Sequence, residues 1–387
     1  MEKIRGTSLG NWLVLEKWMS PQLFAGTQAN DEIWLNRDLE HDELEKRMKH
    51  HRDTYVTKAD FEAIRNHGLN MVRIPVPYFI FGDRPPLIGC VEYLDKAFDW
   101  AEECGLKILI DLHTAPGSQN GYDNGGLTGV CKWCKNQQEV EFVLTVLERL
   151  AQRYGSRPGL FGIEVLNEPI SWIVYRTAPS TGHARDKQEA EGSGHVPTSF
   201  LKQFYRQAYD RIRAFLPEEK TIVFSDGFRL GVWKNFFRRE GMKNVMLDTH
   251  NYLYAMETFV PVPAMWIYKL FVGFNRLSIR RAMKYTPVIV GEWCLECRRP
   301  YYLARKHGKT EAQREEIAKE EYRKIAQLQT RAWETSAGWF FWNYQMYRDI
   351  SAPIAGDGQN DTHGTTMDGW ALNRCWKHGW WPEEQKK

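Results

Sequence analysis

"FGIEVLNEPI" (residues 161–170) begins as a short apolar run and ends in polar residues without an intervening turn. The first part of this run has the β-branched and aromatic composition of a buried strand. Asn167, Glu168 and Pro169 follow at once. The pattern therefore predicts a buried strand that presents a carboxylate at its C-terminal end.

The same kind of run recurs along the chain, separated each time by a stretch with helical periodicity. Apolar residues at i, i+3 and i+4 predict helices over 57–67, 91–104, 137–154, 199–215 and 311–335. Short apolar strands that alternate with helices are typical of a parallel sheet covered by helices. The eight predicted strands are 3–10, 70–76, 107–113, 161–168, 221–227, 245–252, 287–293 and 338–344.

Eight such units in 387 residues predict an α/β fold, namely one (β/α)8 TIM barrel over residues 1–387 with extended loops at the C-terminal face. An open doubly wound sheet is the alternative, but the sequence has no GxGxxG fingerprint. Two connections, 11–56 and 170–197, are longer than a barrel requires. Long loops without secondary structure are usually lids, binding loops or disordered.

The bulk composition excludes several classes of partner. A net charge of +3 is too small to indicate binding to nucleic acid or to an anionic membrane surface. No apolar stretch reaches the roughly 18 residues of a membrane span. The opening "MEKIRGTSLG" has no apolar segment of a secretory signal, so we expect a cytoplasmic location.

The seven cysteines are expected to be reduced thiols in that compartment. Two CxxC pairs occur, Cys131 with Cys134 and Cys294 with Cys297, but they are far apart and lack zinc-ribbon spacing. We therefore predict no metal and no cofactor.

Polar and aromatic residues gather where the predicted strands end, which is where a barrel builds its active site. Any one of them alone is best explained as a buried polar group with its own partners. Six strands that end this way favour a common site, and the residues are Arg73, His113, Asn167, Glu168, His250, Tyr252, Glu292, Trp293 and Trp342.

Two carboxylates in this set indicate glycoside hydrolysis. Strands across a small barrel hold such groups about 5 Å apart, the spacing of a retaining double displacement. Glu292 would then be the nucleophile and Glu168 the acid/base, with a raised pKa in Glu168. We expect Arg73 to keep Glu292 ionised, Tyr252 to hydrogen-bond Glu292, and Asn167 to bind the sugar 2-hydroxyl.

The segments "NMVRIPV", "GIEVLNEP", "DTHNY" and "VIVGEW" resemble the motifs of glycoside hydrolase family 5, retaining enzymes built on a (β/α)8 barrel. "RGTSLGNWLVLEKWMSPQLF" (5–24) and "DLHTAPGSQNGYDNGG" (111–126) are similar to the exo-β-1,3-glucanase branch. The resemblance implies that Glu168 is the acid/base and Glu292 the nucleophile, and that Glu16 binds the non-reducing terminal sugar. It also implies a −1 subsite formed by Arg73, His113, Asn167, His250, Tyr252 and Trp342.

Three further residues have weaker interpretations. Tyr122 and Tyr254 are candidates for the pocket entrance, and Glu296 is expected at the surface. Trp342 is expected to stack on the sugar in the −1 subsite.

The chain departs from the glucanase branch in two places. That branch continues Trp-Lys-Thr-Glu after the eighth strand, whereas this chain has Tyr344, Gln345, Met346 and Tyr347, and its segment 170–197 is longer. The opening of the chain resembles intracellular bacterial β-mannosidases of family 5, which act on Man-β-1,4-GlcNAc from the N-glycan core.

We therefore expect a retaining exo-β-glycosidase that releases a terminal β-linked hexose from a short oligosaccharide. A β-mannosidase is the preferred interpretation, and an exo-β-1,3-glucanase or β-glucosidase is the alternative. An endo-glycanase and a non-catalytic carbohydrate-binding barrel fit the motifs less well. The oligomeric state is not predicted.

Overall fold

The computed structural model describes residues 2–177, 180–260, 262–346 and 367–381. Its eight strands close into a barrel in sequence order, and every neighbouring pair is parallel, including β1 with β8. The predicted (β/α)8 barrel is confirmed, and the open sheet is wrong. The strands are β1 Ile4–Ser8, β2 Met71–Val76, β3 Lys107–Leu112, β4 Leu160–Glu164, β5 Thr221–Ser225, β6 Val245–His250, β7 Val288–Glu292 and β8 Gly338–Phe341.

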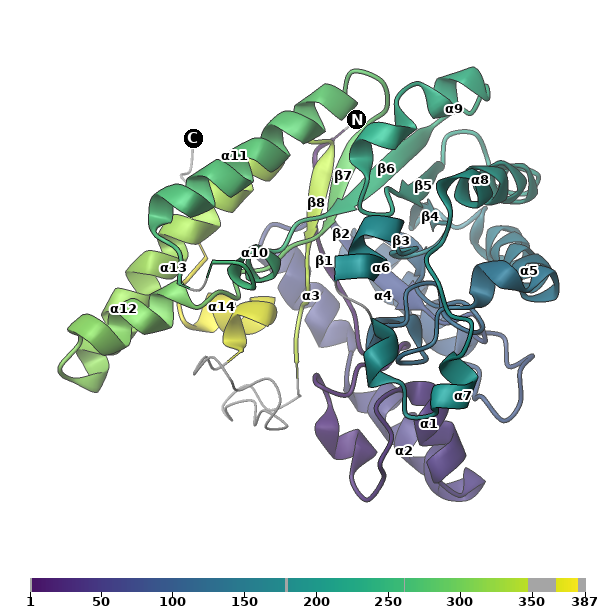
Figure 1. Ribbon diagram of the computed structural model, residues 1–387, viewed down its shortest axis with the longest axis horizontal. Helices are drawn as coiled ribbons and strands as arrows, with labels where there is room; N and C mark the ends of the chain where they lie inside the picture. Colours follow the sequence, from purple (N-terminus) through teal and green to yellow (C-terminus); the bar gives the residue numbers. More distant parts are fainter. Residues whose placement is uncertain (1, 178–179, 261, 347–366, 382–387) are drawn as a thin grey trace.

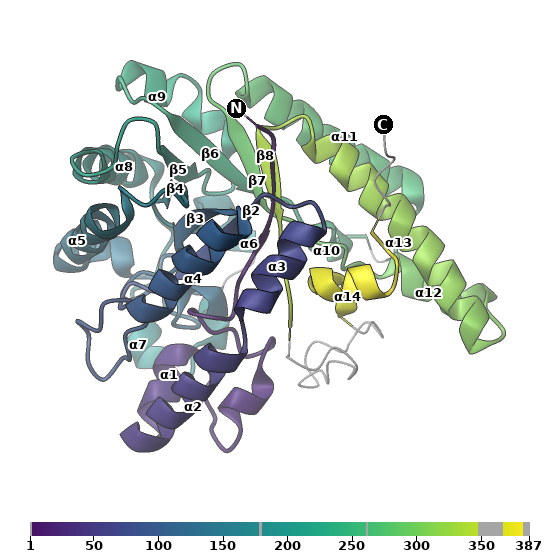
Figure 2. The same ribbon diagram turned by 180° about the vertical axis from the view of Figure 1, so that it is seen from behind.

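Helices surround this barrel (Figures 1 and 2), and the five predicted ones lie within about two residues of their expected bounds. They are α3 Lys58–Asn66, α4 Val91–Cys104, α5 Gln137–Tyr154, α8 Thr198–Arg213 and α13 Glu311–Trp333. The remaining α-helices are α1 Glu32–Asp38, α2 His41–Thr54, α6 Trp172–Thr177, α7 Lys187–Ala190, α9 Phe236–Arg239, α10 Leu253–Glu257, α11 Met265–Ala282, α12 Arg299–His307 and α14 Leu372–Lys377.

Caps in the sequence explain why these helices start where they do. The Asn136 side chain accepts hydrogen bonds from the first backbone N–H groups of α5. Reciprocal capping boxes open α3, with Thr57 and Asp60, and α13, with Thr310 and Gln313. Each cap satisfies backbone donors that have no partner within the helix.

The barrel interior has two layers with opposite polarity. The lower layer, near the strand starts, is apolar and contains Ile4, Met71, Leu109, Val223, Met246, Ile289 and Phe340. The residues two positions further along β2, β3 and β6 face the same way, and they are Arg73, Asp111 and Asp248. A Cβ at Gly291 would overlap the Asp248 carboxylate, so β7 needs glycine there. Charged groups therefore fill the barrel directly below its catalytic face.

The two long connections fold against each other. Residues 11–56 contain α1 and α2, while residues 170–197 contain the short helices α6 and α7. Arg37 makes a bidentate ion pair with Glu189, with both N···O distances at 2.8 Å, and Arg185 Nη1 lies 2.7 Å from Asp38 Oδ2. Figure 1 shows α1, α2 and α7 together at the end of the barrel opposite the N-terminus. The described part of 170–197 is thus docked on α1.

Two further sequence expectations concern the state of the cysteines and the absence of a membrane span. All seven cysteines are free thiols. Among the described residues, the structure contains no helix whose length and apolar character would let it span a membrane.

Candidate active site

The two predicted catalytic carboxylates meet at the C-terminal face of the barrel. Glu292 is the last residue of β7, and Glu168 follows β4. His250 Nδ1 lies 2.7 Å from Glu168 Oε1 and 3.3 Å from Glu292 Oε2. One oxygen of each carboxylate lies within 4.8 Å of the other. This separation suits a retaining mechanism and is too short to hold a water in the way an inverting mechanism requires.

The backbone at Glu168 is unusual, because its φ of 44° lies in the left-handed region. For a residue with a Cβ this conformation costs about 1–3 kcal/mol, and such strain is found where a site fixes a side chain. Asn124 Nδ2 donates to Glu168 Oε2 at 2.9 Å. Both oxygens of this carboxylate are therefore held, one by His250 and the other by Asn124.

Arg73 and Tyr252 hold Glu292. Arg73 Nη1 lies 2.8 Å from Glu292 Oε1, and the Tyr252 hydroxyl donates to Oε2 at 2.6 Å. The expected hydrogen bond from Tyr252 is present, and Arg73 contacts the carboxylate that it was expected to keep ionised. The prediction that Arg73 ends its strand is wrong, since it is the third residue of β2 and lies fully buried inside the barrel.

A second chain of hydrogen bonds runs from Arg73 to Trp342. Arg73 Nη2 donates to Asn167 Oδ1 at 2.9 Å, and Asn167 Nδ2 lies 3.3 Å from His113 Nε2. His113 Nδ1 donates to Asp111, and its ring stacks on Trp342 at 5.5 Å with an interplanar angle of 6°. The hydrogen bonds fix the orientation of Arg73, Asn167 and His113, and the stacking contact fixes His113 against Trp342.

The expectation of a raised pKa in Glu168 is wrong. The surroundings lower the pKa of Glu168 and raise that of Glu292. Burial would raise the pKa of Glu168, but the hydrogen bond and charge of His250 outweigh it and lower the pKa. Burial raises the pKa of Glu292, with partial relief from His250 and Arg73. Burial would lower the pKa of His250, yet Glu292, Asp248 and Glu168 together raise it well above 6.5. The directions of these shifts favour a resting site in which His250 carries the mobile proton, one hydrogen bond from Glu168.

His250→Gln tests this location of the proton through the pH profile of kcat/KM. If His250 holds the proton, the variant must hold it on Glu168 alone, a carboxyl with a lower pKa than the imidazolium. We expect the basic limb of the profile to move to lower pH by roughly one unit or more. If Glu168 holds the proton in the wild type, loss of the His250 imidazolium raises the pKa of Glu168. The basic limb of the pH profile then moves to higher pH. That outcome would contradict the assignment.

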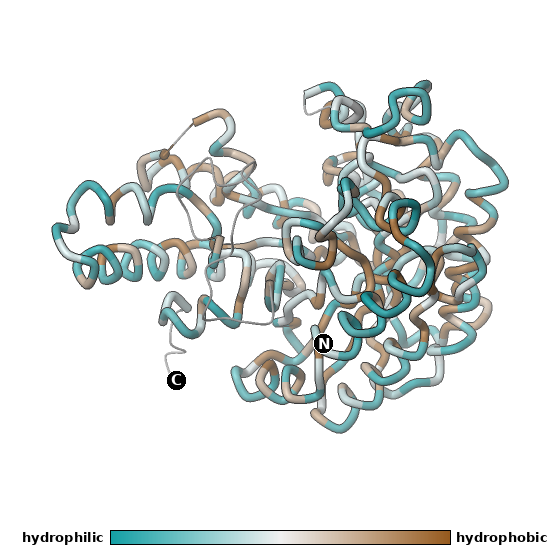
Figure 3. Tube along the Cα trace, turned by 90° about the horizontal axis from the view of Figure 1, so that it is seen from below, coloured by the Kyte–Doolittle hydropathy of each residue, from teal (hydrophilic) through white to brown (hydrophobic). Residues whose placement is uncertain are grey.

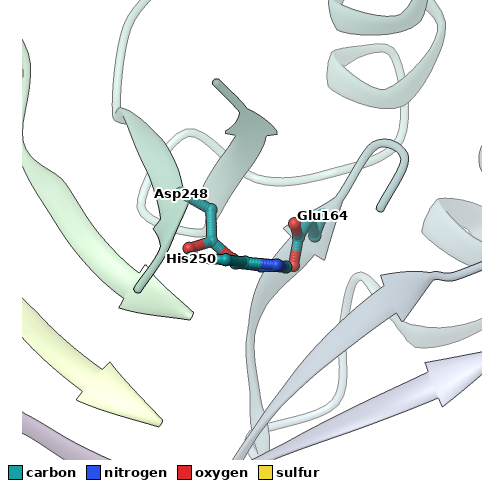
Figure 4. Close-up of side chains that lie close together, drawn as sticks. All are labelled: Glu164, Asp248 and His250. Atoms are coloured by element: carbon teal, nitrogen blue, oxygen red, sulfur yellow. The ribbon is translucent and has the colours of Figure 1, made fainter. Parts of the chain in front are cut away.

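Below His250 lies a cluster of buried acids that sequence reasoning did not identify. Figure 4 shows Glu164 on β4 and Asp248 on β6 close to the His250 ring. Asp248 Oδ2 lies 3.4 Å from His250 Nε2, and Glu164 Oε2 accepts from Arg73 Nε at 2.8 Å. Glu164, Asp248 and His250 each offer one ligand atom, and these atoms lie within 4.8 Å of one another, a spacing that could hold a metal ion. We assign no cation there, because the Arg73 guanidinium already supplies positive charge beside these carboxylates.

Glu16 closes one side of the site. It is buried and accepts a hydrogen bond from Trp18 Nε1 at 2.8 Å. Burial raises its pKa well above 4.5, with smaller contributions from Asp123, Glu292 and Glu168. Its predicted place in the site is thus supported by its surroundings.

The C-terminal segment supplies an aromatic wall that sequence reasoning missed. Trp370 lies 5.3 Å from Trp18 and 5.3 Å from Tyr252 between ring centroids. Its carbonyl accepts from the Asn343 N–H at 2.6 Å, next to Trp342. A sequence with sixteen tryptophans offers no local signal that would single out this one.

Asp123 and Asn124 were also missed, although they belong to the motif 111–126. Burial raises the pKa of Asp123 to about 6. Burial, together with the charge of Glu168, raises the pKa of Tyr122 to about 12, and Tyr254 contacts Trp370 with centroids 6.2 Å apart. Both tyrosines therefore lie near the site, as expected.

Two expectations are wrong. Glu296 is buried and accepts from the Gly369 N–H at 3.2 Å, because the C-terminal segment packs over it. Trp293 faces away from the site and packs against Trp339 and Phe341. Strand alternation explains this, because neighbouring residues on β7 point to opposite faces.

Residues 39–346 match the family model described as cellulase (glycosyl hydrolase family 5). The chain belongs to glycoside hydrolase family 5. This family 5 chain is 34% identical over 379 residues to "Probable glucan 1,3-beta-glucosidase A" of Aspergillus terreus, covering 89% of this chain and 83% of that protein. It is 37% identical over 307 residues to the protein of the same name in Emericella nidulans, covering 76% and 67%.

Solved structures agree with the fold. A rutinosidase from Aspergillus niger superposes with a TM-score of 0.70 at 21% identity, covering 98% of this family 5 chain and 97% of the other. The sequence relatives carry the name of the exo-glucanase branch of the resemblance. The closer resemblance to bacterial β-mannosidases stays a prediction.

Proposed function

We propose that this family 5 glycosidase is a retaining exo-β-glycosidase that removes one terminal β-linked hexose from a short oligosaccharide. The observation that carries the proposal is the pair of carboxylates, Glu168 and Glu292, within 4.8 Å of each other and both in contact with His250. Retention is general among family 5 enzymes, and the separation fits it.

In the first displacement, Glu292 Oε attacks the anomeric carbon, and the bond to the leaving oxygen breaks. Glu168 receives a proton from His250 Nδ1 across the 2.7 Å contact and passes it to that oxygen, which leaves Glu168 ionised and His250 neutral. Arg73 and Tyr252, both bonded to Glu292, keep its attacking oxygen in place. The product is an α-glycosyl ester on Glu292.

In the second displacement, Glu168 accepts a proton from a water that attacks the same carbon. The ester bond to Glu292 breaks, the β-configured sugar leaves, and the proton returns to the Glu168–His250 pair. The imidazolium charge that lowered the pKa of Glu168 falls when His250 has given up its proton, so the pair alternates between acid and base.

The shape of the site favours release of a single terminal sugar. Glu16 and the wall formed by Trp18 and Trp370 bound the region next to the catalytic carboxylates. The hydrogen bonds described above hold Asn167 and His113 in place, and we expect both side chains to bind sugar hydroxyls. The first candidate substrate is a β-1,3-linked glucoside, since the relatives are named for that activity.

A β-mannosidase acting on Man-β-1,4-GlcNAc is the second candidate. The observation that favours it is the segment 170–197, which directly follows the acid/base residue and is held on α1 by ion pairs. A docked segment at that position suits a short substrate better than a polymer. The departures at Tyr344 and Gln345 lie in the core, where Gln345 donates to the Tyr55 carbonyl, and Tyr347 lies outside the described residues.

The deciding experiment compares kcat/KM for para-nitrophenyl β-D-glucoside and β-D-mannoside, and for laminaribiose and Man-β-1,4-GlcNAc. We expect the gluco pair to be preferred. Preference for the manno pair would transfer the assignment to the second candidate. Hydrolysis of neither pair by a folded enzyme would contradict the exo-glycosidase proposal. A cytoplasmic location, which the second candidate needs, stays a prediction that fractionation of the source cells would check.

A further inference from the structure

Helix α11 is apolar on two opposite sides. Its inner side packs on the barrel through Tyr268, Val272 and Ile279, which are buried. On its outer side, four large apolar side chains recur at helical spacing and are mostly exposed. They are Trp266 at 61%, Leu270 at 63%, Phe274 at 67% and Leu277 at 51%, and we call them the outer stripe. A helix that is apolar on both sides is usually buried on both sides.

The outer stripe borders an open groove of about 730 Å³. The groove exists because the barrel is thinly covered between β5 and β6, where the chain forms only a 3-10 turn and the four-residue α9. Phe274 belongs to both the stripe and the groove. The other apolar groove walls include Leu230, Trp233, Phe271 and Tyr285.

More apolar surface precedes the helix. Figure 3, coloured by hydropathy, shows apolar residues interspersed with polar ones along the helices around the barrel. Phe259 is 81% exposed and Val260 39% exposed. Together with the outer stripe, these side chains expose on the order of 600 Å², taking the usual areas of aromatic and aliphatic side chains. That is at the upper limit for a monomer and close to the roughly 800 Å² that each partner contributes to a stable interface.

We propose that the outer stripe of α11 and the adjoining groove form an isologous interface with a second copy of this chain. Most soluble oligomers pair identical surfaces about a two-fold axis, so the surface at such an interface must be complementary to itself. An antiparallel pair centred on residues 271–272 places Leu270 beside the partner's Phe274 and Trp266 beside the partner's Leu277. The stripe is thus complementary to itself.

The charges on α11 favour the same arrangement. The helix has no acidic residue, and three of its four basic residues, Arg276, Arg280 and Arg281, lie toward its C-terminal end, while Lys269 lies in its aromatic N-terminal half. A parallel pair would bring these arginines together. In the antiparallel pair they lie at opposite ends, near the aromatic Trp266 and Phe259 of the partner, where a guanidinium gains a cation–π contact. Trp, Phe and Arg are also residues enriched at interfaces.

Sedimentation equilibrium of the full chain tests the proposal, which does not depend on the glycosidase assignment. We expect the wild type to have the mass of two 45.4 kDa chains at micromolar concentration. Leu270→Lys should raise the dissociation constant by at least about 30-fold, because it places two uncompensated charges in the interface. The matched control is Phe215→Lys, which replaces a 46% exposed side chain elsewhere on the surface and should leave the mass unchanged.

Circular dichroism establishes that both variants fold. A wild-type chain that stays monomeric up to high micromolar concentration would overturn the proposal. So would a Leu270→Lys variant that dimerises as well as the wild type and the control. If the monomer instead binds vesicles of anionic lipid through α11, the face is a membrane-surface site, and the dimer proposal fails.

Discussion

Glu168→Ala is expected to lose about 10²–10⁴-fold in kcat/KM on a disaccharide and to retain much of its activity on a 2,4-dinitrophenyl glycoside. The disaccharide needs a proton on its leaving oxygen, whereas dinitrophenolate leaves without one. Removal of the water-activating base should make release of the sugar slow in both cases. A fast release of dinitrophenol followed by a slow steady state should therefore appear in stopped-flow traces.

Azide makes this prediction specific to the role of Glu168. The anion needs no general base, so it should attack the α-glycosyl ester on Glu292 and restore the steady-state rate. The second displacement inverts the carbon again, and the product should be the β-glycosyl azide, identified by NMR. The matched control is Glu191→Ala, which removes an exposed carboxylate from the same connection and should behave as the wild type. Equal losses on both substrates, without azide rescue, would contradict the acid/base role.

Glu292→Ala is expected to lower kcat/KM by at least about 10⁴-fold on every substrate, including activated aryl glycosides. Without Glu292 no ester forms, and a good leaving group is of no help. Azide or formate should occupy the space of the missing carboxylate, beside Arg73 and Tyr252, and attack the β-glycoside directly.

The product of that reaction should be the α-glycosyl azide, because only one inversion has occurred. Opposite anomers from Glu168→Ala and Glu292→Ala would thus assign the two roles independently of rate. The same anomer from both variants would show that the roles have been assigned wrongly. Thermal unfolding of Glu292→Ala serves as the control that the loss is chemical.

The strands and the catalytic pair could be predicted because their signals are local. An apolar run that stops at a carboxylate, as at Glu168 and Glu292, carries its meaning within about ten residues. The eight-fold alternation then brings the strand ends together without further information. For the same reason the helix bounds were predictable, because the i, i+3, i+4 pattern of apolar residues is local.

What could not be predicted depends on residues far apart in sequence. The lowered pKa of Glu168 is due to His250, 82 residues away. The wall formed by Trp370 depends on how the C-terminal segment returns to the barrel. Trp293 was misassigned because a strand end presents one face to the site and the other to the surrounding helices. The outer stripe of α11 was not identified from the sequence, since exposure cannot be read from periodicity.

The pairing of β1 with β8 has a consequence for the synthesis of the chain. Its first contact joins Ile4 to Gly338, so more than three hundred residues must leave the ribosome between the two strands before the barrel can close. Until then β1 is paired on one side only, with β2, and β8 does not yet close the charged and apolar layers of the barrel interior. Contacts this distant in sequence fold slowly and leave apolar surface open to aggregation. Nascent chains are therefore expected to expose apolar barrel surface until β8 has left the ribosome.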